Sequence, residues 1–164
     1  MLEVSFYVLP AVTGLISRSD VSYEQENPQV ESGSAPGGRE ILACKLAEKA
    51  FRQGLYCVIY TMSEVQSRSI DDLLWTFRNT SFVPHQIVTG NILPSVPQVL
   101  ICNQFLPDQE KLIVINLSHE CPGNLERCER VLEILDDQEG SKQAGRKRYR
   151  HYQQLGANLV THKL

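Results

Sequence analysis

"LYCVIYT", residues 55–61, is a nearly continuous run of apolar, β-branched and aromatic side chains. Such a run is typical of a strand covered on both faces, as in a parallel sheet that lies between helices. Further strand patterns occur at "EVSFYVL" (3–9), "HQIV" (85–88), "QVLIC" (98–102) and "KLIVINL" (111–117). The sequence therefore predicts a sheet of several short strands.

Helical patterns alternate with these strands. The first repeats at positions i, i+3, i+4 and i+7, with Ala43, Leu46, Ala47 and Ala50. It predicts a helix over about 39–53, which Gly54 would end. Ser63 and Gln66 form a capping-box pattern, which opens a second predicted helix running to about residue 77.

Two more helices are predicted towards the C-terminus. The third covers about 123–135, and its apolar seam consists of Leu125, Cys128, Leu132 and Leu135. Ser141 can cap a fourth helix that ends at Gly156. On that helix we expect Ala144, Tyr152 and Leu155 to face the core.

This alternation predicts a single three-layer α/β domain over residues 1–164, with a Rossmann-like arrangement. Its central sheet is expected to be largely parallel, with helices on both faces. Residues 17–38 are polar, rich in Ser, Gly and Pro, and without periodicity. They predict a long mobile surface loop.

The composition is that of a soluble globular protein, with 42% hydrophobic and 21% charged residues. No apolar run approaches the roughly 18 residues of a membrane span, so no membrane partner is expected. Glu3 stands where a signal peptide carries positive charge, so we do not expect export. The five cysteines form no close pairs, which favours the reducing cytoplasm.

Positive charge is confined to one end of an acidic chain. Residues 1–140 hold 10 Lys/Arg and 19 Asp/Glu, a balance of −9. Residues 141–164 hold six Lys/Arg and no carboxylate, a balance of +6. A protein that coats DNA by charge alone is usually basic over a broader surface. A local patch favours a defined anionic partner.

The motifs that carry chemistry are incomplete. "SAPGGRE" (34–40) lacks the glycine spacing and the terminal Lys-Ser/Thr of a phosphate loop. His119, Cys121 and Cys128 lack the further ligands of a zinc site. Cys121 has no histidine that the sequence places as a base for a nucleophile. We therefore expect no cofactor, no metal and no catalytic site.

Trp75 is the first candidate for a partner-binding residue. The apolar stripe of the second helix, Ile70, Leu73, Leu74 and Phe77, is expected to face the sheet. Trp75 lies about 150° from the centre of that stripe, at 100° per residue. Phe82 follows in the next connection. Aromatics in such a connection are often core or lid residues. Exposed, clustered aromatics usually anchor a partner, so the position of Trp75 on the wheel makes it an interface candidate.

The fourth helix carries a basic face. Lys142, Arg146, Tyr149 and Gln153 share one side, with Arg150 flanking. Arginine forks suit carboxylates, and Tyr149 adds an apolar wall. Arginine with an aromatic ring also suits single-stranded nucleic acid, and a solvated basic face is equally compatible with the pattern.

Both surfaces coincide with motifs of a known family. The chain resembles the chi subunit of bacterial DNA polymerase III holoenzyme, from "FYVL" and "CKLAEKAFRQG" onward. The resemblance is strongest in "DDLLWTFRNTSFVPH" (71–85) and "SKQAGRKRYRHYQQLGANL" (141–159). It implies a non-catalytic accessory subunit of DNA replication. Chi proteins bind the psi subunit of the clamp loader on one surface and the acidic C-terminal tail of single-stranded-DNA-binding protein on another.

The resemblance also implies roles for individual residues. The psi-side residues are Trp75, Phe82, Val83 and Pro84. The tail-binding residues are Lys142, Arg146, Tyr149 and Arg150, with Leu135 at the wall of an apolar pocket. DNA would be reached mainly through the tail, and the chain would be a monomer outside the complex. The Trp75 surface could serve psi, a diverged psi or a repair helicase, and direct single-strand binding by the basic helix is the alternative function.

Overall fold

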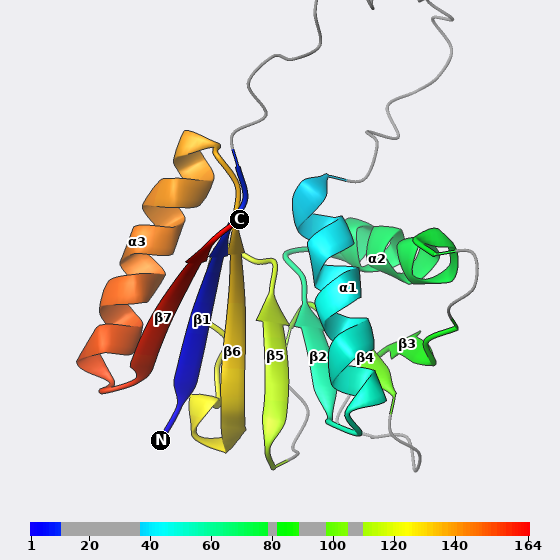
Figure 1. Cartoon of the computed structure of the whole chain (residues 1–164), viewed down its shortest axis with the longest axis horizontal. Helices are drawn as coiled ribbons and strands as arrows, with labels where there is room; N and C mark the ends of the chain where they lie inside the picture. The colour runs from blue at the N-terminus through cyan, green and yellow to red at the C-terminus, as the bar shows by residue number, and fades with distance from the viewer. Residues whose placement is uncertain (11–36, 79–81, 89–97, 105–109) are drawn as a thin grey trace, which may run out of the picture.

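The computed structural model describes residues 1–10, 37–78, 82–88, 98–104 and 110–164. Nearly all of the predicted 17–38 loop lies outside these residues. The described part contains a sheet of seven strands in the order β3-β4-β2-β5-β6-β1-β7 (Figure 1). The strands are β1 (Glu3–Val8), β2 (Cys57–Tyr60), β3 (His85–Ile87), β4 (Val99–Cys102), β5 (Leu112–Asn116), β6 (Cys128–Leu135) and β7 (Asn158–Lys163). Every neighbouring pair is parallel.

Within the described residues, three α-helices cover the two faces of this sheet: α1 (Gly38–Arg52), α2 (Glu64–Thr76) and α3 (Glu139–Gln154). Alternate residues of β2 show the two sides. Cys57 and Ile59 pack with the buried residues of α1 and α2, whereas Val58 belongs to the cluster that contains Tyr152 of α3. The predicted three-layer α/β architecture with a parallel sheet is therefore confirmed.

The end of α1 and the start of α2 agree with the local signals in the sequence. Gly54 follows α1 with φ of 73°, a left-handed conformation that suits glycine. At the start of α2, the Ser63 hydroxyl accepts a hydrogen bond from the amide of Gln66 at 3.1 Å. The Gln66 side chain in turn accepts from the amide of Met62 at 2.9 Å. These reciprocal bonds satisfy amides that the helix itself leaves unpaired.

The third predicted helix, over about 123–135, is wrong. Residues 125–127 form a single 3₁₀ turn, and β6 occupies Cys128–Leu135. Val131, Leu132 and Ile134 are buried between the two helical layers. The sequence did not indicate a strand here because the buried Glu133 interrupts the apolar run that is expected of a strand with two covered faces. The remaining apolar residues then matched a helical spacing.

The C-terminal region differs from the prediction at both ends. The fourth predicted helix exists as α3, but its N-cap is Gln138, so the prediction of Ser141 as the cap is wrong. The Ser141 hydroxyl instead accepts from the amide of Asp136 at 3.4 Å. The helix ends as expected before Gly156, whose φ is 77°. Beyond it, β7 is a strand that the sequence pattern did not indicate.

Candidate partner-binding surfaces

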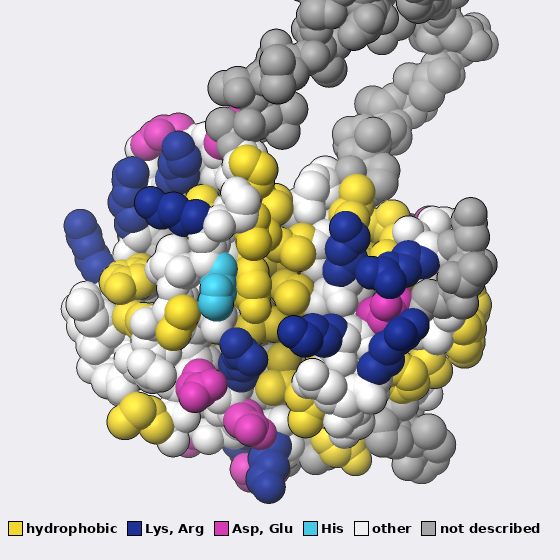
Figure 2. All heavy atoms as spheres, in the orientation of Figure 1, with side chains coloured by type: hydrophobic (Ala, Val, Ile, Leu, Met, Phe, Trp, Pro, Cys, Tyr) yellow, Lys and Arg dark blue, Asp and Glu magenta, His cyan; other side chains and the backbone are white. Residues whose placement is uncertain are grey.

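One flank of α3 is basic and solvent-exposed. Arg146 and Arg150 are exposed, Lys142 is half-buried, and Tyr149 is 36% exposed. Figure 2 shows Lys and Arg side chains gathered over α3, with acidic side chains at its upper end. Arg146 lies 3.8 Å from Glu139 in an exposed pair, which stabilises little and leaves the guanidinium accessible.

Contacts of neighbouring residues show which way this flank faces. The Tyr149 ring lies 5.3 Å from the ring of Phe6 in β1. On the opposite flank, His151 and Leu155 line a hollow with residues 122–126 of the β5–β6 connection. The basic flank therefore faces the edge of the sheet formed by β1 and β7. The expectation that Leu155 faces the core is wrong, because 55% of its surface is exposed.

A glycine brings α3 close to the end of β6. Gly145 is buried against Leu135, and a Cβ at Gly145 would lie only 2.7 Å from Leu135 Cδ2. Any larger side chain would force either Leu135 or the helix to shift. Leu135 is half-buried and lies under the helix that carries the basic residues. Its proposed role in an apolar pocket stays a prediction.

A buried polar network anchors the same helix. Arg148 donates to Glu133 at 2.9 Å and to the carbonyl of His119 at 3.0 Å. Glu133 also accepts from Tyr152 at 2.5 Å and from Asn116 at 2.8 Å. Arg148 is 3% exposed and Glu133 is fully buried. Of the four cationic residues between 146 and 150, one is therefore internal and unavailable to a partner.

Burial and pairing shift the pKa of Glu133 in opposite directions. Burial raises the pKa of the Glu133 carboxyl, because a charge is poorly solvated there. The Arg148 charge and the donors Tyr152 and Asn116 oppose this rise. A buried pair of this kind fixes geometry more than it adds stability. It ties α3 to β6 at Arg148 and Tyr152.

Trp75 and Phe82 form a second exposed surface, beside β3. Trp75 is 57% exposed, as the helical wheel predicts, and Phe82 is 65% exposed. Their ring centroids are 5.4 Å apart. The His85 ring packs edge-on against Trp75, with ring centroids 4.9 Å apart. The His85 ring is fixed between the carbonyl of Val83 at 2.6 Å and Asp71, whose carboxylate is 3.2 Å away.

The other two residues assigned to this surface are less accessible. Val83 is 1% exposed and belongs to the core beneath α1 and α2. Its side chain therefore cannot contact a partner in this conformation, and its assignment to the exposed surface needs correction. Pro84 is half-buried. The alternation of side chains in the connection into β3 decides this: Phe82 points outward and Val83 inward.

The described residues contain no grouping of three or more His, Cys, Asp or Glu that could hold a metal ion. Burial raises the pKa of the Cys121 thiol, which disfavours the nucleophilic thiolate. Cys128 is buried in the core at the start of β6.

None of the described helices has the length and apolar character needed to span a bilayer.

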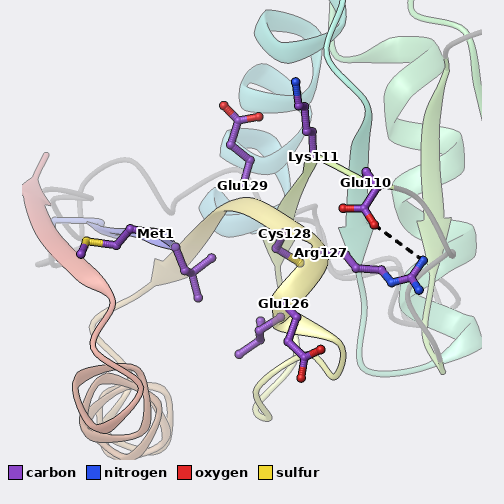
Figure 3. Close-up of a pocket in the computed structure, with 9 residues that line it drawn as sticks. Met1, Glu110, Lys111, Glu126, Arg127, Cys128 and Glu129 are labelled. Atoms are coloured by element: carbon purple, nitrogen blue, oxygen red, sulfur yellow. Dashed lines mark ion pairs between the residues drawn. The ribbon is translucent and has the colours of Figure 1, made fainter.

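A hollow of about 460 Å³ lies at the amino ends of β5 and β6 (Figure 3). Its lining includes Glu110 and Arg127, which form an ion pair at 4.0 Å, together with Lys111, Glu126 and Glu129. Because acidic and basic side chains are mixed, the walls favour neither sign of ligand charge. No predicted site residue lies there.

Comparison with known proteins assigns the family. The model of the DNA polymerase III chi subunit family (HolC) matches residues 1–160. This chain belongs to the DNA polymerase III chi subunit family. Chi is a replication accessory subunit, so the chain is a partner of the replication machinery.

Curated chi subunits are similar over most of the chain. That of Pseudomonas aeruginosa is 30% identical over 164 residues, covering 100% of this chain and 98% of the relative. That of Haemophilus influenzae is 28% identical over 122 residues, covering 74% of this chain and 85% of the relative. That of Escherichia coli is 27% identical over 122 residues, covering 74% of this chain and 83% of the relative.

Among solved structures, that of T4 UvsW aligns with a TM-score of 0.61 at 11% identity. The alignment covers 99% of this chain, which spans 41% of that protein. At this identity the similarity concerns the fold alone. It agrees with the α/β architecture of this chi-family chain.

Some residues that shape the basic surface were missed from the sequence. Arg148, Glu133 and Gly145 position α3, yet none was assigned a role. A signal existed for Gly145, because a glycine inside an amphipathic helix often marks a close approach to a neighbouring element. Arg148 and Glu133 carried none, since charged residues are usually exposed and the two are 15 residues apart.

Proposed function

We propose that this chi-family chain links the clamp loader, through psi, to the acidic C-terminal tail of single-stranded-DNA-binding protein. In this role the chain supplies contacts and no catalytic step. It acts in the cytoplasm, where the chromosome is copied. DNA is reached through the tail-bearing protein and not by direct contact.

The observation that carries the tail half is the exposed basic flank of α3 beside a half-buried leucine. Arg146 and Arg150 are exposed and suit the carboxylates of an acidic tail, because a guanidinium can donate two parallel hydrogen bonds. Tyr149 and Leu135 offer apolar surface for a hydrophobic side chain of the tail. The rest of the chain is acidic, which repels polyanions elsewhere.

The psi half is supported by the Trp75–Phe82 pair. Both rings are more than half exposed and contact each other, and a monomer gains little from leaving two large aromatics in water. Tryptophan is enriched among residues that dominate binding energy. His85 holds the Trp75 ring against the surface, so little side-chain entropy is lost on binding.

Calorimetry with two ligands tests the proposal. A synthetic acidic tail peptide and a bare single-stranded oligonucleotide are titrated separately into the chain at physiological salt. We expect the peptide to bind and the oligonucleotide to bind far more weakly. Tight oligonucleotide binding without peptide binding would instead support direct nucleic-acid recognition by the basic helix. A single tail is expected to bind weakly, and several tails on one DNA-bound protein raise the effective concentration.

A further inference from the structure

The two edges of the sheet differ in how they are protected. Edge strands expose unpaired backbone groups, and natural proteins usually shorten them or place proline beside them. β3, at one edge, has three residues and follows Pro84. β7, at the other edge, has six residues, contains no proline and is mostly exposed. Among the described residues, β7 pairs only with β1.

The hydrogen bonds of β7 define which groups point outward. Asn158 donates its amide to the carbonyl of Leu2 at 2.9 Å, and Leu164 donates to Val8 at 3.0 Å. In a parallel ladder the residues that bond to one neighbour alternate along the strand. The even-numbered residues of β7 therefore bond to β1. The amides and carbonyls of Leu159, Thr161 and Lys163 point away from the sheet.

The side chains of these same three residues lie on the face that α3 covers. Thr161 is in register with Phe6, which contacts Tyr149 of α3. Lys163 is in register with Val8, and Val8 with Leu135, which lies under Gly145. An added strand would thus run beside the basic flank of α3. Lys163 extends that flank to the edge of the sheet.

The other face of β7 carries the side chains of Asn158, Val160 and His162. Val160 is 44% exposed, and His162 is exposed and stacks on Tyr7 of β1 with ring centroids 5.0 Å apart. In Figure 2, a column of hydrophobic side chains lies next to β7 on this side of the sheet, between β7 and α1. Cross-strand neighbours of Val160 and His162 would be apolar or aromatic, because such pairs stabilise sheets.

We propose that an extended acidic peptide pairs with β7 as an eighth strand, with acidic side chains under the basic flank of α3. The occupant is the acidic tail, so the inference rests on the proposed function and specifies how the tail is held. Main-chain hydrogen bonds to Leu159, Thr161 and Lys163 supply part of the affinity, and Arg146 and Arg150 select acidic residues.

Hydrogen exchange of individual amides tests the strand addition. In the free chain, the outward amides of Leu159, Thr161 and Lys163 should exchange fast, and the inward amides of Val160 and His162 slowly. Saturation with the synthetic acidic tail peptide should slow the outward set by about tenfold or more and leave the inward set nearly unchanged. If the peptide binds and the outward amides stay fast, the strand addition is wrong while the proposed function stands. If no peptide binds, the proposed function fails as well.

A matched pair of variants gives a second readout. Thr161→Pro removes one outward donor, whereas Thr161→Ala keeps it and serves as the control. We expect peptide affinity to fall several-fold for the proline variant alone, with the circular dichroism of both unchanged. If the proline variant unfolds, a tail peptide N-methylated at alternate residues replaces it. Two such peptides are compared, one methylated at the odd and one at the even positions. One of the two should fail to bind, and equal affinity for both would overturn the inference.

Discussion

Arg146 and Lys147 are adjacent in α3 and both exposed, yet they project to different sides of the helix. Arg146 lies on the basic flank beside Tyr149, and Lys147 lies about 100° further round. Arg146→Ala should weaken the acidic tail peptide by about 1.5–3 kcal/mol, the range for a charge-assisted hydrogen bond. Arg146→Lys should recover only part, because an ammonium cannot make the paired contact. Calorimetry measures each loss.

Lys147→Ala is the matched control, since it removes the same charge from a neighbouring position. It should change the affinity little. Equal losses for Arg146→Ala and Lys147→Ala would mean that a diffuse basic field attracts the tail, and a specific site on this flank would have to be abandoned. Tyr149→Ala should weaken binding with little change in its salt dependence, because that contact is apolar.

At the scale of the element, α3 depends on the pair between Arg148 and Glu133. Arg148→Ala leaves a fully buried carboxyl without its charge partner, which should cost about 3–5 kcal/mol of unfolding free energy at neutral pH. Chemical denaturation measures this loss. Arg150→Ala removes an exposed arginine of the same helix and should cost far less.

The loss should depend on pH in a defined direction. Burial raises the pKa of Glu133, and removing Arg148 raises it further. A group whose pKa is higher in the folded than in the unfolded state favours folding at low pH and loses that contribution as pH rises. The deficit of Arg148→Ala should therefore shrink under mildly acidic conditions. A deficit that grows on acidification would contradict a buried, uncompensated carboxyl, and Glu133→Gln in the same background should recover part of the stability.

At the scale of the whole molecule, the two candidate surfaces lie at opposite edges of one sheet. Trp75 and Phe82 lie beside β3, and the basic flank lies above β1 and β7 (Figure 1). Distant sites usually act additively. Trp75→Ala should weaken capture of psi by about 2 kcal/mol and leave the affinity for the tail peptide unchanged. Arg146→Ala should do the reverse, as measured by binding to immobilised psi and by calorimetry.

Val83→Ala distinguishes effects on folding from effects on binding at the Trp75 surface. Its side chain is in the core, so this change should lower the unfolding free energy by about 1–3 kcal/mol. Trp75→Ala should leave thermal stability almost unchanged, since much of the ring is in water. A large fall in melting temperature for Trp75→Ala, with psi capture by the folded fraction intact, would show that Trp75 supports the fold instead.

Local signals were sufficient for much of this protein. The apolar run around Ile59 predicted a strand with two covered faces, and Gly54, Ser63 and Gly156 marked helix ends, because capping and left-handed turns depend on near neighbours in the chain. The wheel of α2 likewise placed Trp75 in solvent. These features follow from interactions within a few residues.

Other features were decided only by the tertiary structure. β6 lies between β5 and β1, and its residue Glu133 is buried because Arg148, 15 residues away, and Asn116 supply partners. Arg148 is internal for the same reason, and Val83 is in the core although Phe82 beside it is exposed. β7 becomes an edge strand because it pairs with β1 from the other end of the chain. A charged side chain is buried, and a short polar segment becomes a strand, only where distant residues satisfy its hydrogen bonds, and no local pattern contains those partners.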